Sequence, residues 1–268
     1  MITLFRALTG VLVFAVVAAA QAQVQYYAIT REVYYLQSGA MVNDFDSTRF
    51  VADVQTQNET DYGLFTLTRP GGSSDSLTRF GTYNGLIDDF TNLADRDAQY
   101  PYATYTISAP AGTFGAYSRT ISGDYSLSPA DAPRVLNFDA LRSLSVGQAA
   151  TVFVSGFDAR PGTNNNNASF VLDEYDANGY VQTLVNDVRM NSDAYSFDIE
   201  AGWIRADHTY RVRLKHTSSF LTVNTGFGVG RNDYSQYSEM TFAPVPEPGT
   251  CAPLGLGTLA ILRRRKRA

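Results

Sequence analysis

The chain has 268 residues, among them 21 Lys and Arg, 26 Asp and Glu, and one cysteine. Six of the basic residues but only one acidic residue lie in the two ends, 1–22 and 244–268, so the body 23–243 carries a net charge of −10. Because nucleic-acid binding depends on clustered Lys and Arg, this acidic body argues against a nucleic-acid partner. The single cysteine, Cys251, lies in the tail, so the body forms no internal disulfide and depends on a hydrophobic core.

The first 22 residues have the pattern of a secretory signal peptide. A short basic head ends at Arg6, the stretch 7–20 is almost wholly apolar, and Ala20 and Ala22 supply the small-x-small pattern of a cleavage site. We therefore expect cleavage after Ala22 and export of the remainder.

The C-terminal end combines a proline-rich handle, an apolar stretch and a basic cluster. The handle reads Val245, Pro246, Glu247, Pro248, Gly249 and Thr250, and the cluster reads Arg263, Arg264, Arg265, Lys266 and Arg267. The two prolines exclude a helix and favour an extended handle. The apolar stretch between the handle and the basic cluster, 251–262, has 12 residues, fewer than the roughly 20 that cross a bilayer. It therefore serves at most as a short hydrophobic anchor.

These three parts in this order resemble the PEP-CTERM sorting signal of Gram-negative bacteria. The resemblance implies an exosortase, a membrane-embedded protease and transpeptidase, as the partner of the tail. It also implies transient anchoring in the inner membrane, with the arginines in the cytoplasm, and then delivery to the cell surface or to an exopolysaccharide matrix such as that of a biofilm.

Between the two ends the pattern is that of β-structure. Alternation is cleanest in 209–215, which predicts a half-buried strand. Its apolar face would carry Tyr210, Val212 and Leu214, and its polar face Arg211, Arg213 and Lys215. Stretches rich in aromatic and β-branched residues predict further strands at 24–36, 49–56, 62–68, 102–108, 113–121, 150–157, 169–175, 180–186, 195–199, 220–229 and 236–242.

Two shorter features fit between these strands. Asp176 to Gly179 predicts a hairpin turn, because Asn-Gly tolerates positive φ angles. Only the region 86–98 favours a short helix.

The expected fold class is all-β, with two antiparallel β-sandwich modules between the signal peptide and a C-terminal hydrophobic helix. The proline-containing stretch 128–133 suggests a boundary that separates a β-rich domain, 23–130, from an Ig-like sandwich, 131–243, with the sorting tail at 244–268. One continuous sandwich is the alternative.

The second half also resembles a known module. Ile204 to Tyr210 is similar to the loop-to-strand corner of fibronectin type III domains, with Ala206-Asp207 in place of the family's Pro-Gly. Together with 133–138 and 153–157, this stretch resembles the Ig-like modules of bacterial surface proteins. Such a resemblance implies a fold and no activity.

No catalytic motif is evident, and we expect neither enzymatic activity nor a cofactor. The two histidines, His208 and His216, would lie roughly 26 Å apart on one strand. Adjacent carboxylates such as Asp173 and Glu174 would point to opposite faces of a strand, which disfavours a glycosidase pair. Calcium binding by loop carboxylates stays open as an alternative.

Tyrosines crowd the first expected strand, at Tyr26, Tyr27, Tyr34 and Tyr35. A tyrosine ring offers an apolar face to a sugar while its hydroxyl stays in water, so these four are candidate glycan contacts. The simpler interpretation is that they alternate between core and surface.

The resulting hypothesis is a non-enzymatic exported protein of the cell surface or exopolysaccharide matrix, sorted by an exosortase. The alternatives are a glycan-binding adhesin module and, less favoured, a secreted glycoside hydrolase.

Overall fold

A computed structural model describes residues 24–122, 132–156, 163, 165–190, 194–224 and 228–245. The expected signal peptide, the stretch 123–131 with the expected domain boundary, and the tail after Val245 lie outside these ranges.

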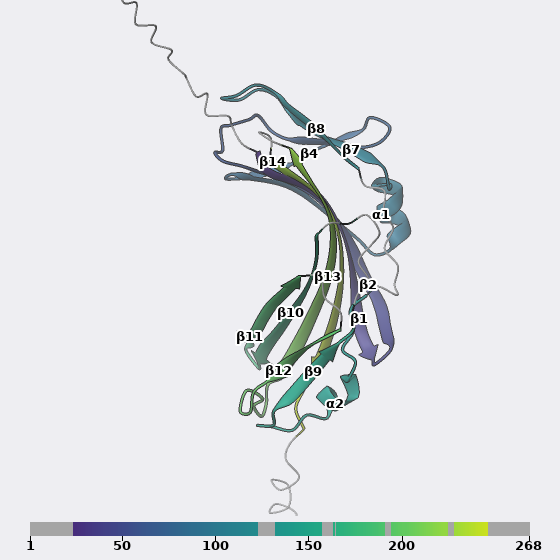
Figure 1. Cartoon of the computed structure of the whole chain (residues 1–268), viewed down its shortest axis with the longest axis vertical. Coiled ribbons are helices and arrows are strands. Elements are labelled where there is room, and N and C mark those ends of the chain that lie inside the picture. The colour runs from purple at the N-terminus through teal and green to yellow at the C-terminus, as the bar shows by residue number, and fades with distance from the viewer. Residues whose placement is uncertain are drawn as a thin grey trace, which may run out of the picture.

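The described chain is an all-β protein, as the sequence predicts. Its main element is an eight-stranded sheet that runs along most of the body and bends strongly (Figure 1). In spatial order the strands are β11 (Gly179–Met190), β10 (Asn165–Asp176), β13 (Thr209–Asn224), β14 (Gly228–Phe242), β1 (Val24–Gly39), β2 (Val42–Thr56), β6 (Tyr83–Phe90) and β5 (Thr78–Phe80).

Strands from both halves of the sequence share this sheet. β1 begins at the first described residue, Val24, and pairs with β14, which lies close to the last described residue. This pairing is parallel, and the other pairings between named strands are antiparallel. One eight-stranded sheet therefore contains strands from both sides of the stretch 123–131.

Two smaller layers pack against one face of the large sheet, one at each end (Figure 1). The upper layer is a four-stranded sheet of β4 (Ser74–Ser76), β3 (Thr66–Thr68), β7 (Thr104–Ala109) and β8 (Tyr117–Ser122). The lower layer consists of β9 (Ala150–Val154) and β12 (Tyr195–Ile199), with the short helix α2 (Phe138–Arg142) beside them. Helix α1 (Leu93–Gln99) falls near the helix expected at 86–98 and contacts β2 and β6.

Each layer encloses its own core on the same face of the sheet. In the upper core, Tyr27 and Ile29 of β1 lie with Phe50 of β2, and all three are at most 2 % exposed. In the lower core, Val212 of β13 and Met240 of β14 pack beneath the lower layer. The register places all of these side chains on one face, which we call the covered face.

The predicted strand at 209–215 is confirmed as part of β13. Tyr210, Val212 and Leu214 are buried on the covered face, as the alternation requires. The hairpin at Asp176 to Gly179 is also present: it joins β10 to β11, and Gly179 has a φ of 121°.

The corner before β13 has the hydrogen bonds expected of a tyrosine corner. The hydroxyl of Tyr210 donates to the carbonyl of Trp203 at 3.0 Å and accepts from the backbone N–H of Arg205 at 2.8 Å. Asp207 is the only described non-glycine residue with positive φ, at 62°. Aspartate tolerates this conformation better than most non-glycine residues, so Asp207 suits the position.

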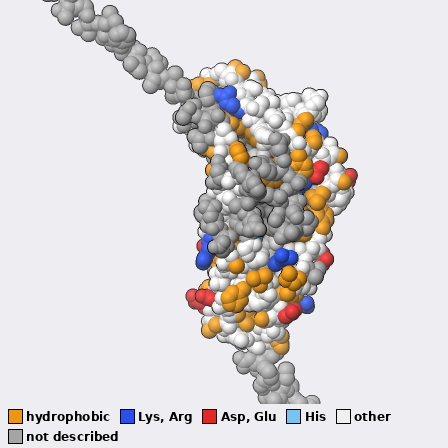
Figure 2. Space-filling model, turned by 45° about the vertical axis from the view of Figure 1, so that its right-hand side comes forward, with side chains coloured by type: hydrophobic (Ala, Val, Ile, Leu, Met, Phe, Trp, Pro, Cys, Tyr) orange, Lys and Arg blue, Asp and Glu red, His pale blue; other side chains and the backbone are white. Residues whose placement is uncertain are grey.

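The outer surface of the lower layer is partly apolar. Leu136, just before α2, is 46 % exposed, and Phe153 of β9 is 51 % exposed between the fully buried Val152 and Val154. In the view of Figure 2, apolar side chains gather over the lower half of the body, with charged side chains around them.

Candidate functional site

The face of the large sheet opposite to the two cores carries the candidate site. No helix or strand of the described ranges packs on this face, which we call the open face. Rows of side chains from β2, β1, β14 and β13 cross it, and the register defines their order. One row contains Ser47, Tyr34, Tyr237 and Lys215.

At the centre of this row, Tyr34 and Tyr237 form what we call the tyrosine pair. Their rings stack with centroids 4.6 Å apart and planes inclined by 11°. Both hydroxyls donate to the same carboxylate, Glu32, at 2.5 Å from Tyr34 and 2.8 Å from Tyr237. Burial, followed by the interactions with Glu32, raises the pKa of both phenols above the usual range, so both remain neutral donors.

Cationic side chains flank the pair on both sides. The Arg49 guanidinium lies 5.7 Å from the ring centroid of Tyr34, and the Lys215 ammonium lies 5.0 Å from that of Tyr237. These distances are within the range of cation–π attraction. Since each ring has its partner on one side and a cation on the other, ring edges rather than free ring faces are left for a ligand.

Below the tyrosine pair, the open face carries a basic stripe on β13, formed by Arg211 and Arg213. Both lie close to Asp173 of β10, with Arg213 at 2.7 Å and Arg211 at 3.5 Å. Arg211 is also 3.8 Å from Glu239. Asp173 is 1 % exposed, so two guanidinium groups compensate a buried carboxylate. Burial raises the pKa of Glu239, while the two arginines act in the opposite direction.

The tyrosine pair and the basic stripe enclose a pocket of about 350 Å³. Its apolar wall comes from the tyrosine pair and Leu36, which is 48 % exposed. Its polar wall comes from Arg211, Arg213, Glu239 and Asp46. A concave site that combines apolar surface with a few convergent polar groups is typical of small-molecule and sugar binding.

The four candidate tyrosines divide between the two faces. Tyr34 lines the pocket, and Tyr26 is partly exposed higher on the open face. Tyr27 and Tyr35 are only 2 % and 4 % exposed because they point to the covered face. Tyr35 borders the pocket, but its ring packs edge-on against Phe45. The rings of Tyr27 and Tyr35 therefore cannot stack on a ligand, and the alternation between core and surface accounts for them.

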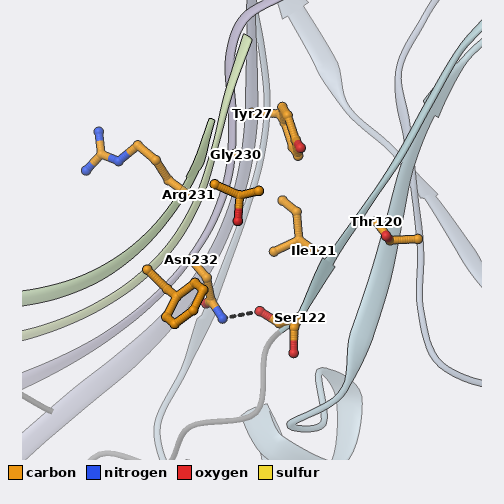
Figure 3. A pocket seen from close by; sticks show the side chains of 9 residues that line it. Tyr27, Thr120, Ile121, Ser122, Gly230, Arg231 and Asn232 are labelled. Carbon is orange, nitrogen blue, oxygen red and sulfur yellow. Dashed lines mark hydrogen bonds between the residues drawn. The ribbon is translucent and has the colours of Figure 1, made fainter. Parts of the chain in front are cut away.

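Tyr27 lines a second, smaller cavity of about 80 Å³ between β8 and β14 (Figure 3). There the Asn232 amide donates to the Ser122 carbonyl. Figure 3 shows Arg231 pointing away from this cavity, to the other side of the sheet. This alternation along β14 places Arg231 on the open face.

Sequence patterns do not single out most residues of the pocket. Tyr237, Glu239 and Asp46 carry no local signal that distinguishes them from other strand residues. The alternation assigns Arg211 and Arg213 correctly to the polar face of their strand, but nothing in the sequence places that face beside Tyr34.

The carboxylate pairs do not converge. Asp173 faces the arginines of the open face, whereas Glu174 is buried on the covered face, 2.9 Å from His208 Nδ1. The neighbours Asp88 and Asp89 are likewise separated: Asp88 binds the Tyr100 hydroxyl, and Asp89 binds Arg49 at 2.6 Å. Within the described ranges, no group of three or more His, Cys, Asp and Glu is placed to hold a metal ion.

Only Val245 of the expected sorting motif lies in the described ranges. Its backbone N–H donates to the carbonyl of Leu144 at 2.9 Å, and its carbonyl accepts from Val146 at 3.4 Å. The folded body thus holds the chain up to the residue before Pro246. Of the helices in the described ranges, none is long and apolar enough to cross a membrane. The remaining motif residues, the basic cluster and the signal-peptide alanines lie outside these ranges.

Comparison with family models and with curated proteins found no match. Among solved structures, α2-macroglobulin of Escherichia coli activated by porcine elastase is 10 % identical, with a TM-score of 0.27, and covers 81 % of this chain and 20 % of its own. The chain therefore spans about a fifth of that protein's length. Fibronectin(III)-like modules of Clostridium thermocellum CbhA are 6 % identical, with a TM-score of 0.25, and cover 84 % of this chain and 92 % of their own.

Both similarities combine low sequence identity with a low TM-score. Their scores are low, so the all-β assignment rests on the strands themselves.

Proposed function

We propose that this protein is a non-enzymatic, exported carbohydrate-binding protein of the cell surface or exopolysaccharide matrix, and that it binds glycan on its open face. The observation that carries the proposal is the 350 Å³ pocket, in which the tyrosine pair lies beside the basic stripe.

The chemistry of the pocket matches that of a sugar ring. A pyranose has apolar C–H patches and a rim of hydroxyls that both donate and accept hydrogen bonds. Leu36 and the edges of the tyrosine pair offer apolar contact, Arg211 and Arg213 offer donors, and Glu239 offers an acceptor.

Two observations support a binding role over catalysis. Asp173 and Glu174, the adjacent carboxylates weighed as a glycosidase pair, have different partners on opposite faces of the sheet. The groups at the pocket are also held by ion pairs and hydrogen bonds to one another, which suits a preformed binding surface.

Export and sorting complete the proposal. The signal-peptide pattern at 1–22 and the resemblance of 245–267 to a PEP-CTERM signal support handling by an exosortase, with transient inner-membrane anchoring before release or transfer. The handle would begin directly at the surface of the body, because Val245 is hydrogen-bonded there.

Binding is tested with the purified protein on a panel of immobilised polysaccharides, followed by calorimetry. Tyr237→Ala is expected to weaken binding at least tenfold, because it removes one of the three side chains of the apolar wall and the stacking partner of Tyr34. The matched control is Tyr180→Ala, which removes an exposed tyrosine on β11 that is 59 % exposed. If no polysaccharide binds, or if both variants behave alike, the pocket is not a glycan site.

Sorting is tested by C-terminal mass spectrometry of the protein from hosts with and without an exosortase. We expect loss of the residues after the Pro246 to Pro248 handle only where the exosortase is present. An intact tail together with a cytoplasmic pool in both hosts would exclude this route.

A further inference from the structure

A second polar cluster lies on the open face above the tyrosine pair. It comprises Asp53 of β2, Ser219 of β13, and Arg231 and Asp233 of β14. Asp53 lies opposite Ala28, which in turn pairs with Arg231, and Asp233 lies directly opposite Ser219. The register thus places these four side chains in two neighbouring rows on the same face of the sheet. We call this group the upper cluster.

Each member of the upper cluster has a buried polar atom that lacks a hydrogen-bond partner within the described ranges. These atoms are Asp53 Oδ1, Ser219 Oγ, Arg231 Nε and Asp233 Oδ1. Ser219 is fully buried and Asp233 is 5 % exposed. Unpaired polar groups at such depth are unfavourable, so a concentration of four in two rows indicates a missing partner.

The cluster is open to solvent at its margin. The Arg231 side chain is 37 % exposed, and Tyr26 and Tyr83 are partly exposed beside Asp53. The Tyr83 hydroxyl donates to Asp53 Oδ2 at 3.5 Å, and Arg231 donates to Asp233 Oδ2 at 2.6 Å. These bonds orient both carboxylates and leave their second oxygens unpaired.

Charge narrows the chemical class of the missing partner. The two carboxylates, Asp53 and Asp233, would repel an anionic ligand. A metal ion would lie beside the Arg231 guanidinium, and the described ranges offer no third acidic or histidine ligand. A neutral polyhydroxylated molecule meets no such opposition, because its hydroxyls donate to the two carboxylate oxygens and accept from Arg231 Nε.

From this geometry we propose that the upper cluster is a second subsite of the open face, which binds neutral sugar units of the same oligosaccharide that occupies the pocket at the tyrosine pair. This inference rests on the proposed function. Asp233 and Tyr237 are four residues apart on β14, roughly 13 Å at the usual rise. Between them, Ser235 of β14 and Thr217 of β13 are buried and share a hydrogen bond of 3.0 Å, so the two subsites are joined by distance along the strands and not by further exposed contacts. An oligosaccharide longer than this separation, lying along the strands, would reach both subsites.

The test uses the neutral polysaccharide that binds best in the panel, hydrolysed to a disaccharide and an octasaccharide, with calorimetry on the full protein. The octasaccharide is expected to bind at least tenfold more tightly than the disaccharide. Asp53→Asn combined with Asp233→Asn should reduce octasaccharide affinity to the disaccharide level and leave disaccharide affinity unchanged. Tyr237→Ala should weaken both. The matched control is Asp139→Asn, which replaces an exposed carboxylate in the first turn of α2.

The failures are distinguishable. If affinity is independent of length, or if the double Asn variant binds like the parent, the second subsite is absent although the glycan-binding function stands. If the octasaccharide oxidised to its uronic acid form binds more tightly than the neutral one, the assigned class is wrong. If the parent protein hydrolyses the octasaccharide and Asp53→Asn does not, the cluster is catalytic and the proposed binding role is wrong. If no polysaccharide binds, the proposed function fails as well.

Discussion

Tyr34 stacks on Tyr237, with ring centroids 4.6 Å apart, because β1 and β14 run parallel and in register at this position. Both hydroxyls converge on Glu32, which is 205 residues from Tyr237 in the sequence. The two central strands of the sheet are thus joined by a side-chain contact on the open face as well as by their backbone hydrogen bonds.

Replacing Tyr237 with Phe tests this contact. The change keeps the stacked ring and removes one of the two hydrogen bonds to Glu32, so the free energy of unfolding should fall by about 1–2 kcal/mol. Urea denaturation measures the difference. Tyr180→Phe on β11 is the control and should change stability by less than about 0.5 kcal/mol. Equal effects of the two substitutions would show that the bond to Glu32 contributes nothing.

The tyrosine corner should be more sensitive, because Tyr210 is fully buried. Tyr210→Phe leaves the N–H of Arg205 and the carbonyl of Trp203 without their partner, and should cost about 1–3 kcal/mol. At the same corner, Asp207→Val should cost about 1–2 kcal/mol, since a β-branched residue tolerates positive φ poorly, whereas Asp207→Gly should be tolerated. Thermal unfolding separates these cases, and an Asp207→Val variant as stable as the parent would contradict the positive φ of Asp207.

Asp53 should make stability depend on pH. Burial, and then the nearby Asp233 carboxylate, raise the pKa of Asp53 from 3.8 to about 6, against the opposing effects of Arg231 and Tyr83. Because the folded pKa lies above the unfolded one, the ionised group destabilises the fold above pH 6, and this penalty disappears as the pH falls towards 4.

The measurement compares the parent protein with Asp53→Asn. From about pH 7 to pH 4, the parent should gain on the order of 2 kcal/mol of stability relative to the variant. Denaturation at both pH values gives this difference directly, and cancels the contributions of all other titrating groups that the substitution does not affect. A difference of the opposite sign would show that Asp53 is not held in a buried, acidic surrounding.

Gly228 should be essential to the start of β14. Its φ is +84°, and an added Cβ would lie 2.0 Å from the Val24 carbonyl oxygen of β1. Gly228→Ala should therefore cost clearly more than about 1 kcal/mol, through both backbone strain and a clash with the neighbouring strand. Gly179→Ala is the control, because Gly179 has a φ of +121° with open space around it, so only the strain applies. Similar losses in the two variants would show that β1 and β14 do not approach each other closely at Gly228.

Local patterns predicted a large part of the fold. The alternation in 209–215 identified the buried and polar faces of β13 correctly, and Asn-Gly identified the turn between β10 and β11. The hydrogen bonds that Tyr210 makes to Trp203 and Arg205 at the start of β13 were not predicted from the sequence. The same alternation explains why Tyr27 and Tyr35 are buried while Tyr26 and Tyr34 reach the open face.

Strand content, the face on which each side chain lies, and the expected address at both ends all follow from the amino-acid order, because they depend on residues close together in the chain. The position of β1 beside β14 does not follow from the amino-acid order. Because the contact of Tyr34 with Tyr237, and their position beside the basic stripe of β13, depend on this pairing, they do not follow from it either. Many strands of similar composition could have been neighbours, and backbone hydrogen bonds do not select among them. The strand order is selected by the packing of the whole sheet against the two cores. That order in turn determines which side chains meet on the open face.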